Sequence, residues 1–238
     1  MQRVQIQFDK EAVLAGHFLL RHLTRDELRQ LAASATLASY SPRETIFQKG
    51  DPGDSLMAVI RGRVKICTHS ADGKELVLNI IDRGGLFGEI AVLDGEPRTA
   101  DAVALVETDL LVLERRRLLP FLTANPETTL RLISVICKRL RQTSEHLEDV
   151  LFLEAPSRLA RSLLRLAETF GKPAAGGTRL DIKLSQQQIG SLVGVSRESI
   201  NKHLGDWQKA GCISIESGYI TILDREIFEE IAEGAAEA

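Results

Sequence analysis

Glycines divide one stretch of the sequence into short apolar runs, and this pattern limits the possible fold more than any other feature. From about residue 40 the runs "ETIFQ", "SLMAVI", "GRVKICTH", "ELVLNII", "TADAVAL" and "DLLVLE" follow one another. Turn residues separate them at intervals of about ten residues, at Gly50, Gly53, Gly62, Gly73, Gly84 and Gly85. Such spacing is typical of an all-β barrel or sandwich. Within it, "SADGKE" at 70–75 predicts a hairpin with Asp-Gly at its tip.

A capping motif marks a helix ahead of the strands. In "TRDELRQLAASATLA", Thr24 precedes a helical pattern and Glu27 follows three residues later. The pair forms a capping box, in which each side chain accepts a hydrogen bond from the backbone N–H of the other residue. We therefore expect a helix to begin directly after Thr24.

A long glycine-free segment follows the strands. "PETTLRLISVICKRLRQTSEHLEDVLFL" has helical periodicity and a heptad seam, with a positions at Ile133, Leu140 and Leu147 and d positions at Ile136, Thr143 and Val150. Two-helix coiled coils are built on such a seam. Thr143, followed by Ser144, is polar, and this pair either sets the register of the two helices or contacts a ligand.

The segment after this helix predicts a second helix, a loop and a tail. Pro156 is expected to break the long helix. "SRLARSLLRLAETFG" then predicts an amphipathic helix that closes at Gly171, and "KPAAGG" at 172–177 is expected to form a loop. The final "EIFEEIAEGAAEA" predicts a short acidic helix with a disordered end.

Two capped helices joined by a glycine turn are expected in "LSQQQIGSLVGVSRESINKHLGDWQKAG", residues 184–211. Ser185 caps the first helix, Gly194 allows an abrupt turn, and Ser196 caps the second helix. This arrangement predicts a helix-turn-helix, whose second helix lies in the major groove of DNA. The next segment, "CISIESGYITIL", predicts two short strands around Ser217-Gly218, which would form a wing. The alternative is an ordinary pair of surface-charged helices.

Polar residues of this segment suit contacts to DNA. Arginine and lysine fit guanine, and glutamate accepts a hydrogen bond from cytosine. Small polar side chains near the start of each helix suit contacts to phosphate. The residues expected to contact DNA are Ser185, Gln187, Ser196, Arg197, Glu198, Asn201 and Lys202.

The segment "FGEIAVLDGEPRTADA", residues 87–102, combines an acid and a base among small residues. Glu89 follows Gly88, and Arg98 stands directly before Thr99. These residues could hold an anionic ligand that also carries hydroxyl groups. They could also form a polar turn in which Arg98 and Glu89 pair at the surface.

The order of these parts resembles the cAMP receptor protein/Fnr (Crp–Fnr) family of bacterial transcription regulators, over roughly residues 20–225. "FGEIAVLDGEPRTADA" is similar to the phosphate-binding cassette of cyclic-nucleotide-binding domains, which has Gly-Glu, a small or apolar turn, and Pro-Arg-Ser/Thr-Ala. The resemblance implies an α+β fold in three parts. These are an N-terminal helix with a jelly-roll-like, cyclic-nucleotide-binding β-roll in 1–125, a long dimerisation helix in 126–154, and a winged helix-turn-helix domain with a short acidic tail in 155–238.

The resemblance also implies which side chains hold a cyclic nucleotide. Arg98 and Thr99 would bind the cyclic phosphate, and Glu89 would accept a hydrogen bond from the ribose 2′-hydroxyl. Thr143 of one subunit and Ser144 of its partner would meet the purine ring. The full expected ligand-binding set is Gly88, Glu89, Ile90, Arg98, Thr99, Arg139, Thr143 and Ser144.

The function that this resemblance implies is a cAMP-responsive, homodimeric regulator that binds palindromic double-stranded DNA allosterically and contacts RNA polymerase. The alternative is a regulator of the same family that needs no nucleotide or senses another small effector. After cAMP, cGMP is the second effector to expect, because a threonine at position 99 is also compatible with a guanine nucleotide. An enzyme such as a phosphodiesterase is not expected, because the histidines are scattered without metal-ligand spacing, at His17, His22, His69, His146 and His203.

Composition sets further limits. The net charge of −3 and the pI of about 6.0 do not indicate a globally basic nucleic-acid binder, so any DNA contact needs a local surface. Neither a membrane span nor a secretory signal is expected, which predicts a cytoplasmic protein. The dispersed Cys67, Cys137 and Cys212 argue against a disulfide framework, a zinc site and an iron–sulfur cluster. His69, near a hairpin tip, is not expected to bind haem.

Overall fold

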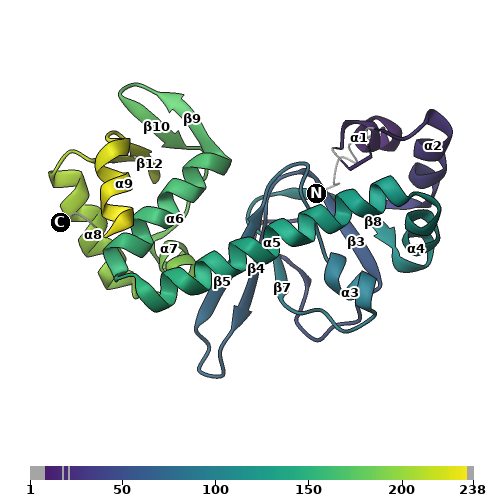
Figure 1. Cartoon of the computed structure of the whole chain (residues 1–238), viewed down its shortest axis with the longest axis horizontal. Coiled ribbons are helices and arrows are strands. Elements are labelled where there is room, and N and C mark those ends of the chain that lie inside the picture. Colours follow the sequence, from purple (N-terminus) through teal and green to yellow (C-terminus); the bar gives the residue numbers. More distant parts are fainter. Residues whose placement is uncertain (1–8, 18, 21, 235–238) are drawn as a thin grey trace. The chain divides into compact units, whose positions relative to one another are not determined.

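The computed structural model describes residues 9–17, 19–20 and 22–234 (Figure 1). They group into two compact units: the first lies within residues 1–68 and 78–140, and the second lies within 69–77 and 141–238. Along the chain, strands of a β-roll are followed by a long helix and then by a helical domain with a small sheet. This order confirms the expected α+β class.

Two short helices precede the sheets, α1 (Lys10–Gly16) and α2 (Arg25–Ser34). The predicted capping box is present, because Glu27 N–H donates to the Thr24 hydroxyl and Thr24 N–H donates to the Glu27 carboxylate. Strands were expected from about residue 40, and this was wrong. They begin with β1 (Ala35–Tyr40), because that segment pairs with a strand far along the chain.

Two four-stranded sheets form the β-roll among the described residues, in the orders β1-β8-β3-β6 and β2-β7-β4-β5. The remaining bounds are β2 (Thr45–Phe47), β3 (Ser55–Arg61), β4 (Val64–His69), β5 (Glu75–Ile81), β6 (Leu86–Phe87), β7 (Asp101–Ala104) and β8 (Thr108–Glu114). The predicted hairpin is present: Gly73 has φ 80°, and Ser70 N–H donates to the Lys74 carbonyl at 2.9 Å. The two-residue strand β6 was not predicted.

Apolar side chains from both sheets meet in one core. Val59 of β3, Phe87 of β6 and Leu110 of β8 come from the first sheet, and Val64 of β4 and Ala102 of β7 come from the second. A separate apolar cluster packs α1, α2, α4 (Arg115–Ala124) and the start of the next helix against the first sheet. The two sheets and the helices packed on them therefore support the cassette.

The long helix α5 spans Pro126–Phe152. Four residues of its expected seam are exposed large hydrophobic side chains: Ile133, Leu140, Leu147 and Val150. Pro156 follows the end of α5 by four residues, so the expected break of the long helix at this proline is confirmed. It lies in the first turn of α6 (Ala155–Phe170). A backbone N–H at this position would have no acceptor within the helix, so proline costs no hydrogen bond here. In the described part of the chain, no helix combines the length and the apolar character needed to cross a membrane.

The second unit contains α6, α7 (Gln186–Val193), α8 (Arg197–Lys209) and α9 (Arg225–Glu233). Its sheet has the order β11-β12-β10-β9, in which β11 spans Ile213–Glu216 and β12 spans Tyr219–Ile222. The expectation of a loop at 172–177 was wrong. β9 (Gly171–Ala174) pairs with β10 (Gly177–Leu180) as a hairpin. β9 is the edge strand of this sheet, which is where a proline such as Pro173 is tolerated.

The acidic C-terminal segment is part of the core of the second unit. α9 packs against α6 and buries Phe228, Ile231 and Ala232. The Phe228 ring meets the Trp207 ring of α8 edge-on, with 4.8 Å between centroids. The disordered end expected after this helix, at 235–238, lies outside the described residues.

Candidate functional site

The cassette, residues 87–102, folds around the short helix α3 (Glu89–Asp94). Glycines at both of its ends have a left-handed backbone, with φ 80° at Gly88 and 81° at Gly95. At Gly88 a side chain also has no room. A Cβ there would lie 2.6 Å from Arg98 Nη1 and 3.1 Å from the Ser55 carbonyl oxygen. Glycine therefore allows the start of α3 to approach Arg98 closely.

Arg98 is buried in the cassette, with 4% of its surface exposed. Its Nη1 donates to the Gly88 carbonyl at 2.9 Å, and its Nη2 donates to the carbonyl and the hydroxyl of Ser55 at 2.8 and 3.1 Å. The guanidinium also lies over the Phe47 ring, 4.3 Å from its centroid. These contacts fix one orientation of Arg98. Sequence analysis missed Ser55 and Phe47, because both reach the cassette from other strands.

One polar atom of Arg98 has no hydrogen-bond partner among the described residues, and this is its buried Nε. Burial lowers the pKa of the Arg98 guanidinium, and the charges of Asp54, Asp51 and Glu89 oppose that shift. A buried N–H without an acceptor destabilises a protein by about 1–3 kcal/mol. An anionic oxygen bound beside Arg98 would supply both the acceptor and a compensating charge.

Glu89 occupies the first position of α3 and is 4% exposed. Its Oε1 accepts a hydrogen bond from Arg139 Nη1 of α5 at 2.5 Å, and Arg139 Nη2 also donates to the Leu86 carbonyl. The alternative of a surface pair between Arg98 and Glu89 is therefore wrong, because both residues are buried and Glu89 pairs with Arg139. A carboxylate has lone pairs on two oxygens, so Glu89 can also accept from a hydroxyl.

The remaining predicted ligand residues are exposed. Ile90 lies on α3, and Thr99 directly follows Arg98. Thr143 and Ser144 lie on α5, within the second compact unit. The structure thus brings the two charged residues of the cassette together with Arg139. The contribution of Thr143 and Ser144 to the pocket stays a prediction.

A separate apolar cavity lies in the first unit. Side chains of α1, α2, the first sheet and α4 line it, among them Leu14, Leu31, Leu56, Leu113 and Leu122. No residue of the cassette contributes to its wall. Leucine dominates this wall, and burial lowers the pKa of His17, which also lines it, so the cavity is not a candidate for the same ligand.

The helix-turn-helix expected at 184–211 is present in the second unit. Ser185 Oγ accepts from Gln188 N–H at 3.2 Å, and the Gln188 side chain accepts from Ser185 N–H at 2.9 Å, which completes a second capping box. Gly194 ends α7 with φ 76°. Sequence analysis missed the role of Gly190, where a Cβ would lie 2.7 Å from the Val195 carbonyl oxygen. This glycine lets the turn pack closely against α7.

All residues expected to contact DNA are exposed: Ser185, Gln187, Ser196, Arg197, Glu198, Asn201 and Lys202. The hydroxyls of Ser185 and Ser196 also cap α7 and α8. Asn201 Oδ1 accepts from Gln186 Nε2 at 2.9 Å, which orients the Asn201 amide. Hydrogen bonds from its own backbone N–H and from the Ser196 hydroxyl lower the pKa of Glu198. Glu198 therefore presents an ionised acceptor at the start of α8.

The expected wing is formed by β11 (Ile213–Glu216) and β12 (Tyr219–Ile222). Ser217 and Gly218 at its tip have φ 51° and 82°, as a two-residue hairpin turn requires. Arg179 lies over the Tyr219 ring at 4.3 Å, and the chain of Lys183 lies against Gly218. These two side chains place positive charge beside the wing.

Two family models match the parts of the chain that carry these features. The cyclic nucleotide-binding domain matches residues 37–125, which include β2 to β8 and the cassette. The Crp-like helix-turn-helix domain matches residues 157–231, which include α7, α8 and the wing.

Two relatives and a solved structure extend this likeness. The CRP-like cAMP-activated global transcriptional regulator of Mycobacterium tuberculosis is 38% identical over 182 residues, which cover 76% of this chain and 81% of the relative. The global nitrogen regulator of a Nostoc species is 30% identical over 199 residues, which cover 82% and 89%. The structure of the c-di-GMP responsive global regulator CLP of Xanthomonas campestris has a TM-score of 0.71 and 26% identity, covering 84% of this chain and 100% of that chain.

Proposed function

The chain belongs to the Crp–Fnr family of bacterial transcription regulators, and on that premise we propose that it is a cAMP-responsive homodimer that binds palindromic DNA. A regulator is proposed and not an enzyme because the relatives named above are regulators, and the cyclic nucleotide-binding model covers the cassette. cAMP is proposed as the effector because the M. tuberculosis relative is named as cAMP-activated. Action in the cytoplasm and contact with RNA polymerase are part of the same proposal.

The buried Arg98, with its unpartnered Nε, is the observation that carries this proposal. A cyclic nucleotide has one negative charge on its phosphate and one free ribose hydroxyl. Arg98 would donate charge-assisted hydrogen bonds to the phosphate, and the exposed Thr99 would add its hydroxyl. Glu89, held by Arg139, would accept from the 2′-hydroxyl. The two opposite charges of the pocket then fit two different groups of one ligand.

The proposed subunit interface is the exposed apolar seam of α5. Exposed leucine and isoleucine at heptad spacing are stabilised when a second helix covers them, as in a coiled coil. In such a pair Thr143 would meet the purine of its own subunit, and Ser144 would meet the purine of the partner. Their hydroxyls can donate and accept, so this pair would help to distinguish adenine from guanine.

The proposed DNA contacts lie on α8 and at the start of α7. Arg197 and Glu198, in the first turn of α8, would read base edges, and Lys202 would reach a guanine or a phosphate. Ser185 and Ser196 would hold the backbone phosphates. A twofold dimer places two recognition helices about one helical turn of DNA apart, so the operator is expected to be a palindrome of that spacing.

Switching requires that the nucleotide favour one arrangement of the dimer. A ligand shifts a conformational equilibrium only by its difference in affinity for the two states. Nucleotide bound by the cassette of one subunit and by Ser144 of the other would favour one packing of the two α5 helices. That packing would set the DNA-binding domains for the operator, and DNA would in turn tighten nucleotide binding.

The test is calorimetry of the purified full-length protein with cAMP, cGMP and c-di-GMP, followed by gel shifts on a palindromic operator. We expect tight cAMP binding that switches on DNA binding. The matched variants are Arg98→Leu, which removes the buried guanidinium, and Arg117→Leu, which removes an exposed one from α4. Only Arg98→Leu should lose the nucleotide response.

Other outcomes would replace the proposal. DNA binding that responds to cGMP or c-di-GMP alone would assign a different effector to the pocket. DNA binding without any nucleotide would leave a regulator that is nucleotide-independent or responds to another small molecule. A normal cAMP response in Arg98→Leu would contradict the assignment of the cassette as the phosphate site.

A further inference from the structure

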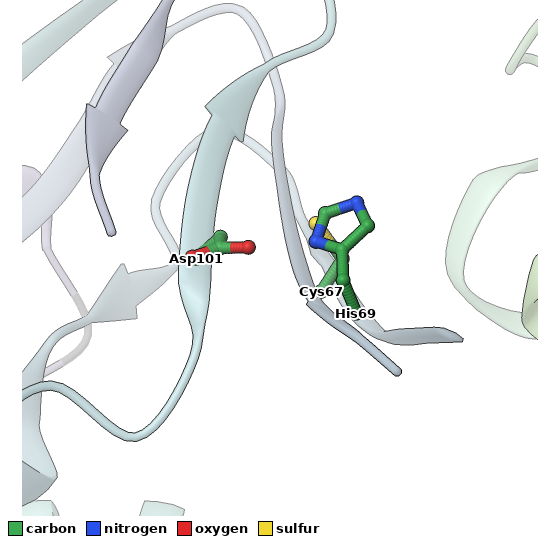
Figure 2. A group of neighbouring side chains, drawn as sticks. All are labelled: Cys67, His69 and Asp101. Carbon is green, nitrogen blue, oxygen red and sulfur yellow. The ribbon is translucent and has the colours of Figure 1, made fainter. Parts of the chain in front are cut away.

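Three side chains on the second sheet of the roll form a group outside the cassette pocket. Cys67 of β4 and Asp101 of β7 are paired directly across the two strands, so their side chains share a face. His69 follows Cys67 by two positions on β4 and therefore shares that face. Figure 2 shows the His69 ring beside the Cys67 sulfur, with one ring nitrogen turned toward Asp101. Ligand atoms of the three residues all lie within 4.8 Å of one another.

Neighbouring groups orient two of these side chains. Asp101 Oδ1 accepts from Lys49 N–H at 2.7 Å. His69 Nε2 lies 3.8 Å from Glu75 Oε2. A histidine that binds a metal through one ring nitrogen usually has a carboxylate, a carbonyl or water at the other nitrogen, which fixes the ring and raises its basicity. Glu75 stands in that position relative to His69.

We propose that Cys67, His69 and Asp101 bind a zinc ion. Zinc accepts thiolate sulfur, imidazole nitrogen and carboxylate oxygen, and water would complete a four-coordinate site. The sulfur ligand disfavours Mg²⁺ and Ca²⁺, which prefer oxygen. On binding, the Cys67 S–H bond breaks, a sulfur–zinc bond forms and the proton passes to the solvent, with no change in oxidation state.

The burial of the three residues suits a site that solvent reaches from one side. Cys67 is 0% exposed, whereas the side chain of His69 is 46% exposed. The ion would enter past the imidazole and meet a thiolate shielded from solvent. The three cysteines are far apart in the sequence, and their positions alone give no sign of a zinc site. The pairing of β4 with β7 instead brings a histidine and an aspartate beside a single cysteine.

The zinc site adjoins the segment between α3 and β7 that carries Arg98. Gly50 N–H donates to the Arg98 carbonyl and Arg98 N–H donates to the Asp51 carbonyl, both at 2.9 Å. Lys49 N–H binds Asp101 in the same loop. Zinc at Asp101 would therefore tie β4 to the start of β7, three residues after Arg98. A ligand that binds only the folded chain raises its stability, so zinc should stabilise the roll whether or not a nucleotide binds there.

The test is a titration of chelator-treated full-length protein with Co²⁺, followed by displacement with Zn²⁺. Cobalt bound to a thiolate gives a near-ultraviolet charge-transfer band, and tetrahedral cobalt gives strong visible bands. We expect one Co²⁺ per chain with both signatures, their loss on adding Zn²⁺, and a higher unfolding temperature with Zn²⁺ than with chelator. Absence of the thiolate band would overturn the proposal.

Matched variants assign the ligands. Cys67→Ser should remove the thiolate band, whereas Cys137→Ser, which changes an exposed cysteine of α5, should keep it. Glu75→Gln should weaken Co²⁺ binding by about 10–100-fold, as for other partners of ligating histidines. His69→Ala changes a partly exposed side chain, so the variant should fold, as circular dichroism checks, and it should lose tight binding. A band that persists in Cys67→Ser, or binding that His69→Ala leaves unchanged, would overturn the proposal.

Discussion

Replacement of Asp149 by alanine is expected to lower the free energy of unfolding of the second unit by about 2–3 kcal/mol. Asp149 lies on α5 and is 2% exposed. Its Oδ1 is 2.8 Å from Arg161 Nη1 and its Oδ2 is 2.6 Å from Arg165 Nη1, both on α6. One carboxylate thus joins the end of the long helix to the first helix of the DNA-binding domain.

The magnitude follows from the burial of the partners. Breaking a fully buried ion pair costs about 3–5 kcal/mol, because a charge remains unpaired without water. An exposed pair contributes only about 0–1 kcal/mol. The side chains of Arg161 and Arg165 are 39% and 34% exposed, so water can reach both after Asp149 is removed. The expected loss therefore lies between these limits.

Trp207 makes the measurement specific to this unit. It is the only tryptophan of the chain, and it is buried on α8. Urea unfolding of the full-length protein, followed by Trp207 fluorescence, therefore reports on the second unit. In a thermal scan the expected loss corresponds to a decrease of roughly 10 °C for a unit of this size. Glu148→Ala, at the exposed neighbouring position on α5, is the matched control.

The refuting result is a loss within about 0.5 kcal/mol of the Glu148→Ala control, the range of ordinary surface substitutions. The two arginines supply an internal check. Arg161 Nη2 also donates to the Ala232 carbonyl at 3.0 Å, at the end of α9. Arg161→Met should therefore destabilise the unit more than Arg165→Met. The opposite order would contradict the assignment of these contacts.

Three further predictions concern the pocket, the pH dependence and the DNA contact. Gly88→Ala should weaken cyclic-nucleotide binding in calorimetry, because a Cβ at φ 80° would lie 2.6 Å from Arg98 Nη1; unchanged affinity would refute it. Burial, followed by the charge of Arg165, lowers the pKa of His146 below 6.5. The unfolded chain therefore binds a proton more readily than the folded chain, and stability should fall as the pH drops below that value. His146→Gln should make the urea midpoint of unfolding depend less on pH. Arg197→Ala should weaken operator binding by about 1–3 kcal/mol and relax the preference at one base pair in gel shifts; an equal loss on all sequences would make Arg197 a phosphate contact.

Local motifs were predictable from the sequence because their partners lie within one turn. The capping boxes of Thr24 with Glu27 and of Ser185 with Gln188 need only a spacing of three residues. The turn at Gly194 needs only a residue that tolerates a positive φ. The cassette was found for a related reason, since its acid, its base and its glycines all lie within sixteen consecutive positions, 87–102.

Contacts between distant segments were not predictable in this way. Ser55 holds Arg98 from 43 residues away, and Arg139 reaches Glu89 from 50 residues away. Neither spacing has a periodic signature, because the pairing of strands and the packing of α5 set both distances. The same holds for "KPAAGG", residues 172–177, whose composition predicts a turn. Its first three residues belong to β9 because they pair with β10.

Under the proposed function, the Glu89–Arg139 pair gives the effector a direct influence on α5. A hydroxyl that donates to Glu89 draws negative charge away from the contact with Arg139 and so weakens it, but the carboxylate has room for both donors. The ligand thus changes the strength with which the cassette holds α5 without replacing the ion pair. The phosphate acts elsewhere, at Arg98, whose hydrogen bonds run to Gly88 and Ser55 rather than to α5. Because only interactions that differ between two states can shift an equilibrium, affinity would arise mainly at Arg98, and Glu89 would act in switching together with Ser144 of the partner subunit.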